Sequence, residues 1–276
     1  MRNIDVPYTV CLSVYKNDCP KYFLAAIRSV AQQTIMPYEI ILTIDGPISS
    51  ELEESIVLFQ KEYPSLRIIR FLDNKGHAAA RQAAIEAAKT DLIAIMDSDD
   101  ISISNRMELE LQYLQQHPEV DIVGGQIEEF IENESNIVGK RVVPLQDGNI
   151  KKYLKKRCPM NLVTVFFKKD AIQRVGGFID WYCEEDYYLW IRMAEAGCVF
   201  ANIDKTLVFV RVGNEMYQRR GGWKYFKSEE KIQRYMFAHK LIRFHTYLYN
   251  TIIRFILQVL MPNKLRGFIF QKFART

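Results

Sequence analysis

The chain has 276 residues, of which 49% are hydrophobic and 25% are charged, and its formal net charge at pH 7 is +4. A chain of this size and composition can bury a substantial core, which excludes wholesale disorder and suits one large α/β domain or one domain with an appendage. Acidic residues concentrate in the first two thirds, and basic residues far outnumber them from Arg211 onward. We therefore expect the C-terminal segment to contact an anionic partner, such as a phospholipid, a lipid pyrophosphate or nucleic acid.

The five cysteines are dispersed, without a CxxC or a Cys/His spacing. An odd, dispersed set favours a reducing compartment and argues against a disulfide framework or a zinc site. Residues 1–10 lack the apolar core of a signal peptide, and no uninterrupted apolar run in the sequence reaches the roughly 20 residues that span a bilayer. These features predict a cytoplasmic protein.

Short apolar runs alternate with helix-like segments through the first 125 residues. Because the runs look buried on both faces, the alternation predicts right-handed crossovers in a mostly parallel, Rossmann-like sheet flanked by helices. In chain order, we expect strands at 8–14, 38–44, 66–72, 92–96 and 120–123, and helices at 20–33, 50–64, 77–89 and 105–116.

After residue 125 the pattern changes. We expect, in order, a hairpin over 126–143, a basic helix over 150–157, a strand over 162–167, a helix over 187–196 and a strand over 199–210. Residues 223–273 look helical, basic and rich in aromatic side chains. The chain is therefore predicted to consist of an α/β domain, residues 1–215, and a basic amphipathic helical segment, residues 216–276.

The most informative stretch is LIAIMDSDD, residues 92–100, in which a buried strand delivers three aspartates into a turn. Ligands of such sheets bind beyond the carboxyl ends of the strands. Two carboxylates one residue apart, Asp97 and Asp99, suit Mg²⁺ or Mn²⁺ sharing its shell with diphosphate oxygens, where the metal neutralises the charge on a departing nucleotide diphosphate. The alternative is that Asp99 or Asp100 caps the next helix.

Three other motifs have both a structural and a functional interpretation. Asp45 follows a strand and is either a turn residue or an acceptor for the ring N–H of uracil. Gly76 precedes a helix whose N-terminus attracts phosphate, and Arg81, one turn in, either binds a phosphate or base carbonyl or is simply solvated. Glu185 and Asp186 begin a helix, where they either complement its dipole or supply a general base.

The motifs follow one another in a specific order and spacing between residues 9 and 211. They are Leu12-Ser13-Val14-Tyr15, the segment 28–34, Asp45-Gly46, Asn74-Lys75-Gly76, Ala80-Arg81, Asp97-Ser98-Asp99-Asp100, Val175-Gly176-Gly177-Phe178 and the segment 185–190. In this combination the chain resembles family 2 glycosyltransferases with the GT-A fold. Among these it is most similar to bacterial enzymes of capsule, exopolysaccharide and O-antigen assembly.

The resemblance implies a role for each matching residue. Asp186 would be the catalytic base, supported by Glu185, and a single base implies direct displacement with inversion at the anomeric carbon. Asp97 would approach the ribose and, with Asp99, bind the metal. The nucleotide-sugar would be lined by Ser13, Tyr15, Asp45, Gly76, Arg81, Asp97 and Ser98. The pairing of Asp45 with Arg81 suits uracil, so the implied donor is a UDP-hexose or UDP-N-acetylhexosamine, and the implied acceptor is a lipid-linked glycan.

The C-terminal segment is expected either to pack on the main domain with a solvated charged face or to lie on anionic lipid at the inner face of the cell membrane. A lipid-linked acceptor favours the second interpretation. Single-stranded nucleic acid is disfavoured, because nothing upstream supports it.

Two other functions stay open at this point. A nucleotidyltransferase normally has a glycine-rich phosphate loop after its first strand, whereas residues 13–20 contain no glycine. A catalytically silent scaffold that binds nucleotide-sugar conflicts with the intact Asp97, Asp99 and Asp186, although a fold alone never proves turnover.

Overall fold

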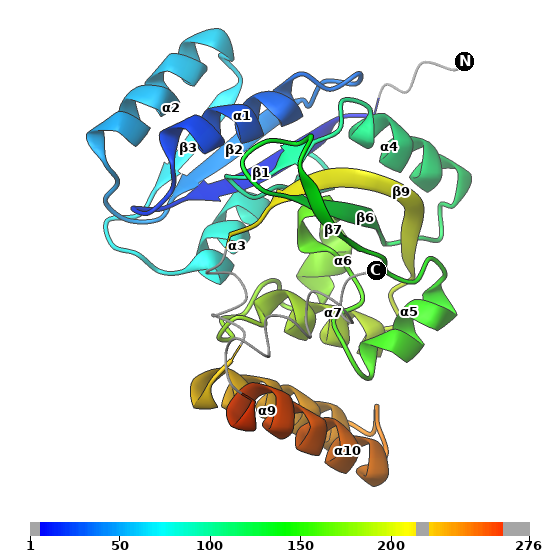
Figure 1. Cartoon of the computed structure of the whole chain (residues 1–276). Helices are drawn as coiled ribbons and strands as arrows, with labels where there is room; N and C mark the ends of the chain where they lie inside the picture. Colours follow the sequence, from blue (N-terminus) through cyan, green and yellow to red (C-terminus); the bar gives the residue numbers. More distant parts are fainter. Residues whose placement is uncertain (1–5, 214–220, 262–276) are drawn as a thin grey trace.

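The computed structural model describes residues 6–213 and 221–261, in which strands and helices alternate through the first half of the chain (Figure 1). The strands are β1 (Tyr8–Val14), β2 (Glu39–Ile44), β3 (Leu66–Arg70), β4 (Leu92–Ile95), β5 (Ile101–Ser102), β6 (Ile122–Phe130), β7 (Ile137–Arg141), β8 (Phe166–Lys168) and β9 (Phe200–Arg211). The helices are α1 (Pro20–Ala31), α2 (Ser50–Glu62), α3 (His77–Ala87), α4 (Arg106–Gln116), α5 (Asp147–Leu154), α6 (Lys169–Arg174), α7 (Glu185–Glu195), α9 (Trp223–Ala238) and α10 (Phe244–Phe255).

The strands form one sheet in the order β3-β2-β1-β4-β8-β6-β9-β5, with β7 paired to β6. The strands β3, β2, β1 and β4 are parallel to one another, as the strand–helix alternation predicts. In the second half only β6 and β9 run parallel, while β8, β7 and β5 are antiparallel to their neighbours. The sheet is therefore mixed. The antiparallel pairing of β6 with β7 follows from the short hairpin between them, because a short loop joins only antiparallel strands.

Helices cover both faces of the sheet, which gives three layers. Successive side chains of a strand point to opposite faces. Accordingly Val10 and Leu12 of β1 pack in one hydrophobic cluster with α1, α2 and α4, whereas Cys11 packs in a second cluster with α3, α5, α6 and α7. The strand β2, between β3 and β1, is buried at every position, as the continuous apolar run predicts.

Two strands differ from the sequence-based expectation. The strand expected at 120–123 and the first arm of the expected hairpin are one continuous strand, β6, because β9 pairs with it from Ile122 to Phe130. The strand expected over 162–167 is shorter. Leu162–Thr164 forms a 3-10 turn, and pairing starts only at Phe166.

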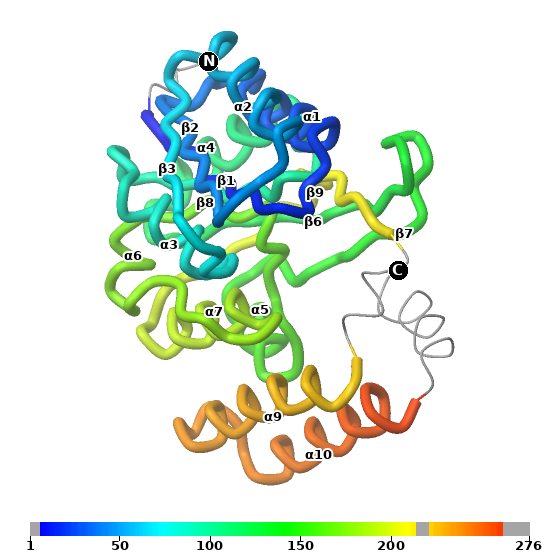
Figure 2. The backbone as a smooth tube through the Cα atoms, turned by 90° about the vertical axis from the view of Figure 1, so that its left-hand side faces the viewer, coloured from blue at the N-terminus to red at the C-terminus, as the bar shows by residue number. Residues whose placement is uncertain are grey.

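The C-terminal helices α9 and α10 lie side by side at one end of the molecule, below α5 and α7 in Figure 2. Ile232 and Met236 of α9 belong to the same hydrophobic cluster as Trp190 of α7. The first described part of this segment thus packs on the α/β domain. The expected domain boundary at residues 215 and 216, and the expected helical residues after 261, lie outside the described residues.

Candidate active site

A cavity of about 740 Å³ lies where the end of β4, the start of α7 and the strands β6 and β9 meet. The turn after β4 contributes Asp97 and Asp99, and the start of α7 contributes Glu185 and Asp186. The two acidic motifs that the sequence singles out therefore face one space. Ligand pockets typically measure about 300–1,000 Å³, so a nucleotide-sugar fits a cavity of this size.

Arg81 of α3 joins the two acidic motifs. Its side chain is only 7% exposed and donates hydrogen bonds to Asp97 Oδ1 at 3.0 Å and to Glu185 Oε1 at 2.9 Å. Burial opposes the charged guanidinium, but the carboxylates of Asp97 and Glu185 prevail and hold the pKa of Arg81 above its ordinary value. Arg81 is thus a permanent cation that fixes the turn after β4 to the start of α7, and the alternative of a solvated arginine is wrong.

Asp45 shapes the loop that leads into α3. Its carboxylate accepts hydrogen bonds from the backbone N–H groups of Lys75 at 2.6 Å and Gly76 at 2.9 Å, and from Asn74 Nδ2 at 2.9 Å. At the neighbouring Gly46 the backbone φ is +86°, and a Cβ would lie 2.7 Å from Asn74 N, so only glycine fits there. Asp45 acts here as a loop-organising residue, and its contact with uracil stays a prediction.

The exit of β1 lies beside the same loop. The ring of Tyr15 contacts the ring of His77, the first residue of α3, edge-on at 5.8 Å between centroids. Ser13 is half-buried one residue before the end of β1. Gly76 takes a φ of +89° next to open space, which suits a close approach of a ligand to the backbone. Ser13, Tyr15, Asp45 and Gly76 thus gather at the exits of β1 and β2, next to the cavity but not among the residues that line it.

Asp18 connects the β1 exit to the acidic turn. Cys19 is the N-cap of α1, and Asp18 accepts a hydrogen bond from Tyr15 N at 2.8 Å. Burial raises the pKa of Asp18, while hydrogen bonds from Tyr15 N and the buried Ser98 side chain lower it in part. Asp18 therefore joins the three aspartates of the acidic turn in one group of interacting carboxyls.

Burial and neighbouring carboxylates disfavour the ionised forms of Asp99 and Asp100 in the acidic turn. Desolvation, followed by the charges of Asp97 and Asp18, raises the pKa of Asp99 to about 6. Burial and the neighbouring aspartates also raise the pKa of Asp100 well above its ordinary value. Asp100 accepts a hydrogen bond from Arg211 N at 2.8 Å, and the next helix, α4, starts after Asn105, so the helix-capping alternative is wrong.

Whether these carboxylates fit a metal follows from their chemistry. Hard divalent cations prefer carboxylate oxygens, and Mg²⁺ and Mn²⁺ usually complete their shell with water and substrate phosphate. Within residues 6–213 and 221–261, no group of three or more His, Cys, Asp or Glu side chains is arranged to hold a metal. Asp97 and Asp99 thus fit a cation that is shared with a bound diphosphate.

The start of α7 presents Asp186 to the cavity. Burial and the neighbouring Glu185 raise the pKa of Asp186 above its ordinary value, which strengthens the carboxylate as a base. Tyr187 N donates to its Oδ1 at 2.7 Å, and the Cys158 thiol lies 3.6 Å from its Oδ2. These contacts orient the carboxylate.

One cavity residue, Tyr225, comes from α9 of the C-terminal segment. Its hydroxyl donates a 2.6 Å hydrogen bond to Glu184 Oε1, and Glu184 is 6% exposed and directly precedes Glu185. The sequence offered no signal for Tyr225, which lies outside the predicted α/β domain. Arg211 was also not assigned to the site from the sequence; its guanidinium lies 3.9 Å from the ring centroid of Tyr22, and both residues line the cavity.

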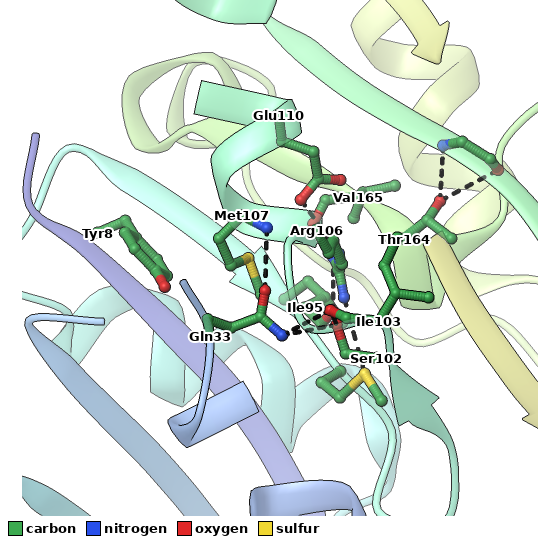
Figure 3. Close-up of polar contacts among 12 residues, drawn as sticks. Tyr8, Gln33, Ile95, Ser102, Ile103, Arg106, Met107, Glu110, Thr164 and Val165 are labelled. Carbon is green, nitrogen blue, oxygen red and sulfur yellow. Dashed lines mark hydrogen bonds and ion pairs between the residues drawn. The ribbon is translucent and has the colours of Figure 1, made fainter. Parts of the chain in front are cut away.

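A buried polar frame holds the strand that carries the acidic turn (Figure 3). Arg106 is fully buried and donates from Nη2 to the carbonyls of Ile95 at 3.2 Å and Val165 at 3.3 Å, and from Nε to Glu110 at 3.1 Å. Gln33 accepts a hydrogen bond from Met107 N at 3.1 Å. Because Ile95 lies two residues before Asp97, this frame fixes where the acidic turn leaves the sheet.

A parallel nucleotide-type half-sheet, an acidic turn at the end of its strand and a second acidic motif across the same cavity define a nucleotide-dependent transferase. The family model for "Glycosyl transferase family 2" matches residues 9–180. The chain belongs to this family and is a glycosyltransferase, as the motif order predicted.

The relatives agree with this assignment along the whole chain. The UDP-Gal:alpha-D-GlcNAc-diphosphoundecaprenol beta-1,3-galactosyltransferase of Escherichia coli is 34% identical over 98% of this chain and 98% of its own length. The amylovoran biosynthesis glycosyltransferase of Erwinia amylovora is 32% identical over 96% and 98%. A mannosyltransferase of Pyrobaculum calidifontis, solved with GDP-Man and Mn²⁺, is similar in structure with a TM-score of 0.64 at 14% identity, covering 95% of this chain and 73% of that one. The expected GT-A fold is confirmed.

Proposed function

We propose that the protein is an inverting glycosyltransferase of surface polysaccharide biosynthesis. It transfers a hexose or N-acetylhexosamine from a UDP-sugar to a sugar linked to a lipid diphosphate. One observation carries this proposal: Asp97 and Asp99 share a cavity with Asp186, and Arg81 bridges the two motifs. The Escherichia coli relative, whose name specifies a UDP-sugar donor and a diphosphoundecaprenol-linked acceptor, supports the choice of substrates.

The donor would lie along the strand exits, with its base near Asp45 and its diphosphate near the acidic turn. Asp97 and Asp99 would hold Mg²⁺ or Mn²⁺, which supplies charge neutralisation for the leaving UDP. The raised pKa of Asp99 supports this role, because burial and the carboxylates of Asp97 and Asp18 disfavour its ionised form and the charge of Arg211 offsets them only in part. Gly76 at the start of α3 offers an approach to the helix N-terminus, where backbone N–H groups favour phosphate oxygens.

Asp186 would take the proton of the acceptor hydroxyl. The hydroxyl oxygen then forms a bond to the anomeric carbon, the bond from that carbon to the UDP oxygen breaks, and UDP leaves with the bonding electrons. A single displacement of this kind inverts the anomeric configuration. Glu185, paired with Arg81, would hold the base and the donor turn at a fixed separation, which contributes the positioning part of the rate.

The proposed acceptor places the enzyme at the inner face of the cell membrane. No helix in the described residues has the length and apolar character needed to cross a bilayer. The basic C-terminal segment supports a peripheral association with anionic headgroups.

Calorimetric titration tests the donor site. The wild type is titrated with UDP, GDP and dTDP, with and without Mn²⁺, alongside Asp99→Ala and the control Asp204→Ala, which changes an exposed carboxylate on β9. We expect Mn²⁺-dependent binding of UDP that Asp99→Ala loses and Asp204→Ala keeps. Equal binding of UDP by wild type and Asp99→Ala would refute the metal site, and no nucleotide binding at all would refute the proposed donor.

A further inference from the structure

The helix α10 presents its apolar side to the outside. Five apolar side chains spaced four residues apart stand on one face of α10 and the turn that follows it, and each is exposed to between 42% and 63%. They are Phe244, Leu248, Ile252, Ile256 and Leu260. We call these residues the α10 row. Residues four apart are neighbours on the helix surface, so the row is a continuous stripe that winds gradually around the outer side of α10 and of the π-helical turn Ile256–Leu260.

The helix α10 packs on the protein through the rings of Tyr247 and Phe255, which contact α9, and through buried polar side chains. Asn250 donates to Lys155 O at 2.9 Å and to Gln233 Oε1 at 2.8 Å, and Arg254 forms an ion pair with Glu229 at 2.8 Å. Gln258 is 5% exposed and is another of these buried polar side chains. A helix on the surface of a water-soluble domain normally buries its apolar stripe and exposes its polar one. The contacts of Asn250 and Arg254 show that α10 is docked with polar side chains facing the protein and the α10 row facing outward.

The charge around the row indicates what covers it. Lys240 and Arg243 are exposed just before the row begins, and the sequence contains no Asp or Glu after Glu230. A second copy of the chain would bring the same positive charge to the interface, which disfavours self-association. An apolar stripe next to basic residues, with Tyr249 63% exposed beside it, matches helices that lie in the interface of an anionic bilayer.

We propose that the α10 row inserts into the boundary between headgroups and acyl chains of an anionic bilayer, while Lys240 and Arg243 bind the headgroup phosphates. Tyr225 of the neighbouring helix α9 lines the cavity. The pair of helices α9 and α10 therefore also borders the site where a lipid-linked acceptor would react. The link between this membrane surface and a lipid-linked acceptor rests on the proposed function.

Vesicle sedimentation with the full chain tests the proposal. Vesicles of phosphatidylcholine alone and of phosphatidylcholine with about one third phosphatidylglycerol are compared at low and high salt. The test variant is Ile252→Ser/Ile256→Ser, and the matched control is Val57→Ser/Leu58→Ser, which removes two apolar side chains of similar exposure from α2. The substituted side chains are exposed in both variants, so we expect both to fold. Calorimetric titration with UDP checks that each variant is folded.

We expect the wild type and the control to bind the anionic vesicles, more weakly at high salt, and the test variant to lose on the order of a hundredfold in partitioning. Unchanged vesicle binding by the test variant would overturn the proposal. So would light scattering that shows the wild type and the control as dimers and the test variant as a monomer. If no variant binds UDP but vesicle binding still depends on the row, the proposed function fails while the membrane surface stands.

Discussion

Replacing Arg106 by methionine tests the buried frame beneath the acidic turn. Arg106 and Glu110 are both fully buried, so the substitution leaves the Glu110 carboxyl without its cation and the carbonyls of Ile95 and Val165 without that donor. Breaking such a pair costs about 3–5 kcal/mol where Glu110 is ionised, at about pH 9. For a chain of this size each kcal/mol lowers the melting temperature by about 2–4 °C, so we expect Tm to fall by roughly 6–20 °C.

The loss should depend on pH with a defined sign. Burial raises the pKa of Glu110 from 4.5 to about 8 even beside Arg106. Between these values the folded state binds more protons than the unfolded state, so this group makes the wild type less stable as pH rises from about 5 to 8. Without Arg106 the pKa rises further. The variant then buries a neutral acid at pH 6, and its deficit relative to wild type should grow towards pH 9.

The double variant Arg106→Met/Glu110→Leu separates charge from packing. It removes both ions, so we expect it to recover most of the lost stability and to come within about 1–2 kcal/mol of wild type. Urea unfolding followed by circular dichroism at pH 6 and pH 9 measures all three proteins. At pH 9, a single variant within about 1 kcal/mol of wild type, or a double variant no better than the single one, would refute the reasoning.

The remaining predictions concern the cavity. Tyr225→Phe removes a hydrogen bond to a carboxylate, worth about 1.5–3 kcal/mol, so kcat should fall about tenfold or more with an unchanged KM for the donor. Initial rates measure the change. The control is Tyr38→Phe, which alters an exposed tyrosine outside the cavity, and an unchanged kcat in Tyr225→Phe would contradict the prediction. Metal binding needs ionised carboxylates, and the pKa of Asp99 is about 6, so affinity for Mn²⁺ should rise from pH 5 to 7 and then level off. Asp99→Asn should flatten this profile in calorimetry, and a flat wild-type profile would argue against the site.

The nucleotide-binding half of the fold could be predicted from sequence because its signals are local. Apolar runs such as residues 39–44 are buried throughout, and the rule that ligands bind at strand exits directed attention to Asp45 and Asp97. The family comparison confirms the glycosyltransferase assignment that these motifs indicated. The antiparallel strands of the second half were less predictable, because their pairing depends on partners far away in the sequence.

The contacts that assemble the site are not local. Arg81 meets Glu185 across 104 positions of sequence, so no pattern near Arg81 distinguished a bridging cation from a solvated one. Tyr225 reaches the cavity only because α9 packs on α7, and the polar spacing of Asn250 and Arg254 does not say which face of α10 is buried. Side chains that act across elements need the tertiary packing before they can be recognised.

The most direct test of the account is a transfer assay with a UDP-sugar and a sugar linked to a lipid diphosphate, comparing wild type with Asp186→Asn. We expect the wild type to release UDP and form a product whose new anomeric bond is inverted, as read by nuclear magnetic resonance. Loss of a general base typically costs about 10²–10⁴-fold in rate, so the variant should bind UDP but transfer at least about a hundredfold more slowly. A wild type that binds UDP without turnover, or an Asp186→Asn variant with full activity, would contradict the central claim that Asp186 drives an inverting transfer.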